Sequence, residues 1–115
     1  MAYTRLNPKD NLTDSGWVHL KNSGNVTTGR YRKLGGVVYL DVGLGGVEQI
    51  MINSSGVNLG TLPAGYRPSD TAVVSATLMT NGSGQLSVGT DGAVTAYNFA
   101  TASWYYAAFI AFPVG

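Results

Sequence analysis

The chain has 115 residues, no cysteine and a net charge of +1 at pH 7, which suits one domain and excludes disulfides, thiolate metal sites and Cys nucleophiles. The near-neutral charge gives no general attraction to nucleic acid, and no apolar run approaches the ~18 residues of a membrane span, so we expect neither nucleic-acid binding nor membrane insertion. Charged residues make up only 11% of the chain, less than half the ~25% of an average globular protein, which favours association with further copies of the chain.

Residues 1–16 open the chain with polar side chains and include Pro8. Such a segment is typical of a lead-in or linker whose order depends on its neighbours. We therefore expect one folded domain over residues 17–115.

Residues 31–43 have the sequence pattern of a β-hairpin. Residues 31–34 and 37–43 are rich in aromatic and β-branched side chains, and a Gly-Gly pair at 35–36 separates them. Strand propensity on both sides of a two-residue glycine turn favours an antiparallel pair. The run 47–52 that follows fits either a strand or a short helical turn.

Four further strands are predicted from the middle of the chain. Residues 57–62 form the first, before a Pro-Ala-Gly turn. Residues 71–79 form the second, and their mostly apolar positions predict burial on both faces. Residues 85–90 and 93–98 flank an Asp-Gly turn and predict a second hairpin.

The last strand is predicted over residues 104–112, where apolar side chains occupy both faces. Even-numbered residues share one face and odd-numbered residues the other. We expect one face to pack inside the protomer and the other to lie near the threefold axis of an assembly. No sustained 3.6-residue apolar pattern occurs, so the sequence predicts an all-β domain of about eight short strands, arranged as a sandwich or barrel.

Five segments combine strand and turn motifs in a fixed order. They are 11–20 with its Trp, 31–40 (YRKLGGVVYL), 59–68 (LGTLPAGYRP), 85–97 and 104–114. In this order they resemble the C-terminal head domain of bacteriophage tail-fibre and baseplate receptor-binding proteins of the Gram-positive siphophage type. The resemblance covers nearly the whole chain, and it implies a jelly-roll-like β-sandwich that assembles as a homotrimeric head.

The resemblance also implies a function at the phage tail tip. A head of this kind belongs to the virion and acts outside the host cell. Its partners are its own copies in a homotrimer, other phage tail proteins and a host cell-wall saccharide, and multivalency lets weak sites suffice. One alternative is a structural or adaptor module of the tail or baseplate that binds no host receptor. Another is a cellular C1q-like or tumour-necrosis-factor-like trimer, against which the lack of a signal peptide argues.

Catalysis is not expected from the distribution of reactive side chains. His19 is the only histidine, and the six acids are scattered singly along the chain, so neither a nucleophile with its base nor a carboxylate pair is marked. The glycines lie in predicted turns rather than in a phosphate-binding motif. We therefore predict a non-catalytic protein without a cofactor or a metal.

Carbohydrate contact is the chemistry that the composition favours. Sugars present apolar C–H faces and dense hydroxyls, which require aromatic rings for stacking and planar polar groups for hydrogen bonds. Six residues offer these groups and are the predicted saccharide contacts: Trp104, Arg32, Asp41, His19, Tyr97 and Asn98. The last two end the second predicted hairpin and fit equally well as turn and edge residues.

The other candidates also have structural interpretations. Arg32, with Arg30 on the same strand face, suits either sugar hydroxyls or an anionic wall polymer. Asp41 is alternatively the outward member of an alternating strand, and His19 a structural side chain. Trp17 is interpreted as packing, because aromatic residues are the usual core and interface material of β-sandwiches.

Overall fold

The structure is a computed structural model that describes residues 14–45, 52–78, 84–99 and 105–115. Its strands are β1 (Val18–Lys21), β2 (Thr27–Leu34), β3 (Val37–Gly45), β4 (Val57–Thr61), β5 (Ala72–Leu78), β6 (Gly84–Val88), β7 (Ala93–Asn98) and β8 (Tyr105–Pro113). The prediction of an all-β domain with about eight short strands is confirmed. Nearly all of the ambiguous run 47–52 lies outside the described residues. In the described part of the chain, no helix is long and apolar enough to cross a membrane.

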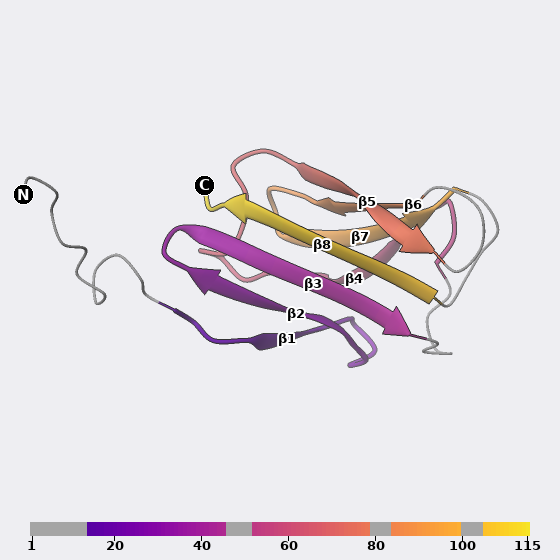
Figure 1. The fold of residues 1–115 in the computed structure, drawn as a ribbon, viewed down its shortest axis with the longest axis horizontal. Helices are drawn as coiled ribbons and strands as arrows, with labels where there is room; N and C mark the ends of the chain where they lie inside the picture. The colour runs from indigo at the N-terminus through magenta and orange to yellow at the C-terminus, as the bar shows by residue number, and fades with distance from the viewer. Residues whose placement is uncertain (1–13, 46–51, 79–83, 100–104) are drawn as a thin grey trace, which may run out of the picture.

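The strands form an antiparallel sheet that folds over on itself, in the order β1-β2-β3-β8-β5-β6-β7-β4. Strand β5 joins the two halves, because residues 72–76 pair with β6 whereas Thr77 and Leu78 pair with β8. Figure 1 shows β3 and β8 side by side in one layer, with β6, β7 and β4 behind them. The second layer has Greek-key order, since β4 lies beside β7 after the β5-β6-β7 meander, and jelly rolls are built from such units.

The hydrophobic core lies between the two layers and is filled by alternate residues of the strands. This follows from the two-residue period of a strand, which sends successive side chains to opposite faces. The largest contributions come from the inward residues of β3 and β8: Val38, Leu40, Val42, Leu44, Tyr106, Ala108, Ile110 and Phe112. The predicted alternation of the last strand is therefore confirmed, with residues 107, 109 and 111 exposed on its outward face.

A buried tyrosine links the two layers at β8. The Tyr106 hydroxyl donates a hydrogen bond to the carbonyl oxygen of Gln85 on β6. Burial raises the pKa of Tyr106 above its ordinary value, because the phenolate loses hydration there. The phenol therefore remains a donor to this partly buried carbonyl even in alkaline solution.

One strand prediction is wrong, namely burial of both faces of residues 71–79. On β5, alternate residues are exposed, and Val73 is 53% exposed. Only the opposite face, with Ala72, Val74 and Ala76, packs against the core. An apolar strand is buried on both faces only where other elements cover both of them. Among the described residues, no element covers the outer face of β5.

The sheet is nearly closed where β1 approaches β4. A register shift between Leu20 and Lys21 leaves Thr28 as an extra residue on β2, a β-bulge that turns its side chain inward. The Thr28 hydroxyl lies 2.6 Å from the carbonyl oxygen of Leu59 and 3.2 Å from that of Leu20. Gly60, at φ +138°, permits the approach, since a Cβ there would lie 2.6 Å from the carbonyl oxygen of Lys21. We call this contact the seam.

Candidate functional site

The outward face of β1, β2, β3 and β8 carries three of the six side chains that sequence reasoning selected as saccharide contacts. The hairpin through the Gly-Gly turn aligns Arg30 with Asp41 and Arg32 with Tyr39 across β2 and β3. Strand β1 places His19 opposite Arg30, and β8 places Phe109 opposite Asp41. Directly opposed residues on one face lie within side-chain contact range. The four strands therefore build a continuous surface, which we call the outer face.

The segment before β1 is fastened to the end of β2. Asp14 forms a β-bridge with Leu34, and Ser15 exchanges hydrogen bonds of 2.9 Å with the backbone of Lys33. The Asp14 carboxylate accepts hydrogen bonds from Arg32 Nε, at 2.8 Å, and from Arg32 Nη2. These contacts fix the chain immediately before Trp17, and so they set where that side chain lies.

Trp17 interacts with both arginines of the outer face. The guanidinium carbon of Arg30 lies 4.2 Å from the centroid of the Trp17 ring, and that of Arg32 lies 5.9 Å from it. Both distances are within the range of cation–π attraction. The indole is nevertheless 41% exposed. It is thus held by its neighbours while keeping surface available to a ligand.

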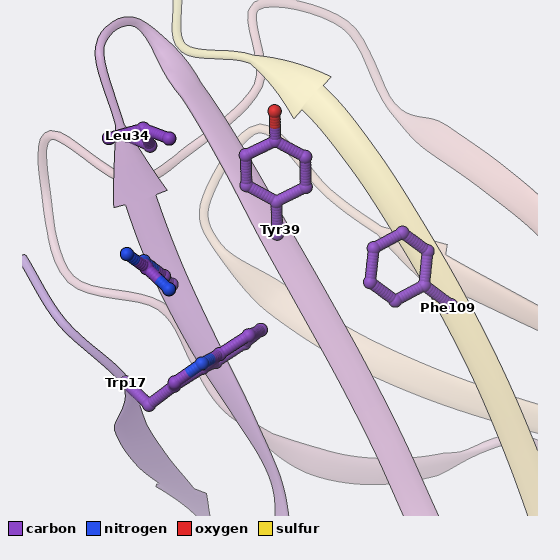
Figure 2. A pocket seen from close by; sticks show the side chains of 5 residues that line it. Trp17, Leu34, Tyr39 and Phe109 are labelled. Carbon is purple, nitrogen blue, oxygen red and sulfur yellow. The ribbon is translucent and has the colours of Figure 1, made fainter. Parts of the chain in front are cut away.

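Beside Trp17 the outer face is hollowed. This aromatic hollow has a volume of about 280 Å³ and is lined by Trp17, Arg32, Leu34, Tyr39 and Phe109. Figure 2 shows the rings of Tyr39 and Phe109 face on and the Trp17 indole edge on. The centroids of Tyr39 and Phe109 are 6.3 Å apart with planes tilted by 35°. The rings of Tyr39 and Phe109 and the indole of Trp17 therefore border the same space.

A second hollow lies next to the first. This polar hollow, of about 260 Å³, is lined by His19, Thr27, Gly29, Arg30, Asp41 and Gly43. Arg30 Nε donates to Asp41 Oδ2 at 3.3 Å within it. Its floor is open at Gly43, where an added Cβ would meet no heavy atom within 4 Å. The polar hollow thus offers donors and acceptors beside open space at Gly43.

The arginines of the outer face are each paired with a carboxylate. Hydrogen bonds from Arg32 and from the Gly16 amide hold the pKa of Asp14 below its usual range, since both stabilise the ionised carboxylate. The same carboxylate raises the pKa of Arg32. Arg30 pairs in turn with Asp41. Each arginine is therefore neutralised locally by the carboxylate beside it.

Of the six predicted saccharide contacts, three come together on the outer face. Arg32 lines the aromatic hollow, and His19 and Asp41 line the polar hollow. Trp104 lies outside the described residues.

The other two predicted contacts lie on β7, in the opposite layer. Tyr97 stacks on Phe99, with centroids 5.7 Å apart and planes 12° from parallel. Asn98 is completely buried, so the expectation that it presents an amide to a ligand is wrong. The reason is strand alternation, which turns Asn98 inward together with Val94 and Ala96.

Sequence reasoning missed several residues of the aromatic hollow. Trp17 was interpreted as packing, and Tyr39, Leu34 and Phe109 were not selected as ligand contacts. Counting outward from the Gly-Gly turn pairs residue 32 with residue 39, and alternation along the last strand already placed Phe109 outward. Pairing of Asp14 with Arg32 carried no comparable signal, because it depends on how the lead-in crosses β2.

The outer face offers chemical groups that can bind a ligand. Aromatic rings stack on apolar ligand faces, and guanidinium and carboxylate groups form hydrogen bonds with hydroxyls. Within the described ranges, no group of three or more His, Cys, Asp or Glu side chains is placed to hold a metal ion.

Comparison with known proteins adds no assignment to this geometry. No protein-family model matches the chain, and a search of curated proteins finds no match either. The resemblance to phage receptor-binding heads therefore stays a prediction from the sequence segments, and the function has to be argued from the outer face.

Proposed function

We propose that this chain is a non-catalytic saccharide-binding domain, the receptor-binding head of a phage tail tip that recognises a host cell-wall saccharide. The observation that carries the proposal is the aromatic hollow, where Trp17, Tyr39 and Phe109 surround one open space. Phe109 is 54% exposed. Contact of its apolar ring with water is unfavourable, and a ligand stacked on the ring would remove that contact. Arg32 at the same hollow supplies donors for hydroxyl groups.

The phage context rests on the five sequence segments that resemble receptor-binding heads. In this context the domain belongs to the virion and works beside other tail proteins. A homotrimer would present several shallow hollows at once, and multivalency would raise avidity far above the affinity of one site. The low charged fraction of 11% supports self-association, because little electrostatic repulsion opposes contact between copies.

The state of Asp14 does not suit the general-acid role of a glycosidase. Retaining and inverting glycosidases require one carboxylic acid that is protonated near neutral pH. The two hydrogen bonds from Arg32 instead favour the ionised form of Asp14. This carboxylate suits positioning of an arginine rather than proton donation.

The direct test is calorimetric binding of wall oligosaccharides from Gram-positive cells to the purified protein and to two phenylalanine variants. Phe109→Ala should weaken binding by about tenfold, the scale of one lost stacking contact. Phe99→Ala is the matched control, since Phe99 is 52% exposed but lies on the opposite layer beside Tyr97. Equal effects of the two variants, or no binding by the unaltered protein, would refute the proposal.

A structural or adaptor module of the tail or baseplate is the second candidate. It is favoured by the apolar outward strip of β8, which would equally suit a protein partner. Labelled protein distinguishes the two functions, because a receptor-binding head decorates host cells whereas an adaptor binds a tail protein and ignores them. Light scattering on the same preparation reports whether the chain is trimeric.

A further inference from the structure

We infer that the aromatic and polar hollows form one continuous site, and that its ligand is an uncharged oligosaccharide longer than one ring rather than an anionic wall polymer. The inference deepens the proposed saccharide binding and rests on it. It concerns two properties that the resemblance leaves open, the length of the ligand and its charge.

The two hollows are adjacent because the same two strands, β2 and β3, supply residues to both. On β2, Arg32 lines the aromatic hollow and Arg30 the polar one; on β3, Tyr39 and Asp41 do the same. In each strand these are successive residues of one face, which places them ~7 Å apart along the strand. The two hollows therefore follow one another along the strand direction, without an intervening element.

Their volumes also favour a joint site. Ligand pockets commonly measure ~300–1,000 Å³. The hollows, at about 280 Å³ and 260 Å³, each fall just below that range and together fall within it. An extended ligand with one ring stacked beside Trp17 and the next above Gly43 would use both.

Local charge compensation argues against an anionic ligand. Arg32 is engaged by both oxygens of Asp14, and Arg30 by Asp41. A phosphate or carboxylate group that approached either arginine would meet a carboxylate already bound there, and like charges at such distances repel. An anionic polymer thus gains little here.

A sugar hydroxyl, in contrast, fits beside both pairs without breaking them. A guanidinium has five N–H donors and a carboxylate about four acceptor positions. Arg30 gives its Nε–H to one oxygen of Asp41, so other donors of Arg30 and the second oxygen of Asp41 remain for hydroxyls. Because a hydroxyl both donates and accepts, neighbouring hydroxyls on one ring can address the two groups together.

Charge selectivity is tested with two probes, a pool of neutral oligosaccharides from Gram-positive wall polysaccharide and purified glycerol-phosphate teichoic acid. Binding is measured in about 0.1 M and about 1 M NaCl, between which the Debye length falls from ~10 Å to ~3 Å. We expect the neutral pool to bind with nearly the same affinity at both salt concentrations. Binding of teichoic acid alone, weakened by salt, would overturn this inference while keeping a receptor-binding role at the host wall, with the anionic polymer as the ligand in place of a saccharide. Binding of neither probe would overturn the proposed function as well.

Continuity of the site is tested by filling the polar hollow. Gly43→Val adds bulk where a Cβ meets nothing within 4 Å, so the fold should tolerate it. The variant should bind the neutral oligosaccharides about tenfold more weakly while a single sugar keeps its affinity, as expected for one lost subsite. Gly36→Val is the control, since Gly36 is equally open but lies in the β2–β3 turn outside both hollows. Unchanged oligosaccharide binding by a folded Gly43→Val would refute the joint site.

Discussion

Asp14 accepts two hydrogen bonds from the Arg32 guanidinium, and this pair joins the segment before β1 to the outer face of β2. Arg32 lines the aromatic hollow and Trp17 follows Asp14 by three residues, so the pair fixes two walls of the hollow at once. Bidentate arginine–carboxylate pairs define orientation as well as distance. We therefore regard Asp14 as a positioning residue for the proposed site.

Asp14→Asn should weaken oligosaccharide binding by up to about fivefold, because a neutral amide cannot hold Arg32 through two charged hydrogen bonds. Tryptophan emission, to which Trp17 and Trp104 both contribute, should change together with the dissociation constant in one fluorescence titration, and Trp104→Phe in the same background isolates the signal of Trp17. Asp70→Asn, at an exposed carboxylate away from the hollows, is the control. If Asp14→Asn bound like the unaltered protein, Asp14 would have no positioning role.

Lowering the pH should remove the stability that the Asp14–Arg32 pair contributes. The pKa of Asp14 is lowered in the folded protein from an ordinary value of 3.8, chiefly by the hydrogen bond from Arg32. A lowered folded pKa means that the stabilising contribution is complete above the unfolded pKa and is lost as pH falls toward the folded pKa. Stability measured by urea unfolding should thus lose this contribution below about pH 4, and Asp14→Asn should lose less than the unaltered protein.

The seam provides a test of stability that does not involve the ligand. Thr28→Val keeps the side-chain shape but removes the hydroxyl that donates to the buried Leu59 carbonyl at 2.6 Å, with the Leu20 carbonyl 3.2 Å away. We expect a loss of about 1–3 kcal/mol in the free energy of unfolding, measured by denaturant titration. Thr27→Val, at the exposed neighbouring residue, should change it by less than about 0.5 kcal/mol. Similar losses in both variants would contradict the role given to the Thr28 hydroxyl.

Gly60→Ala tests the close approach at the same seam. A Cβ at Gly60 would lie 2.6 Å from the carbonyl oxygen of Lys21 and 2.7 Å from a methyl group of Leu20, at a φ that disfavours side chains. We expect the free energy of unfolding to fall by about 1–3 kcal/mol, seen as a lower melting temperature. Gly43→Ala, which meets open space at an ordinary φ, should instead leave stability unchanged or slightly higher. A Gly60→Ala protein as stable as the unaltered one would show that the seam is loose.

Much of the fold could be predicted because short-range patterns determine it. The Gly-Gly turn, the Asp-Gly turn and the alternation of the last strand each act over a few residues. Burial of the outer face of β5 was predicted wrongly because Val73 has the same chemistry whether or not another element covers it. Coverage is a property of the tertiary arrangement, which an apolar run does not encode.

The site was less predictable than the fold because it joins strands that are distant in sequence. Arg32 and Asp41 were selected for their chemistry, and the hairpin brought them to one face. Phe109 joins them only through the pairing of β3 with β8. Asn98 had suitable chemistry as well, but its strand phase turned it into the core.

The pairing of β3 with β8 has a further consequence for how the protein reaches its working state. Val37 lies opposite Pro113 and Asp41 opposite Phe109, so this pairing joins residues that are separated by most of the chain. Closing such a long loop is entropically slow, whereas the β2–β3 hairpin needs only local contacts. Tyr39 and Phe109 become neighbours only when β8 pairs with β3. A chain that has formed its hairpins but has not docked β8 would therefore lack the aromatic hollow, and ligand binding would report completion of folding.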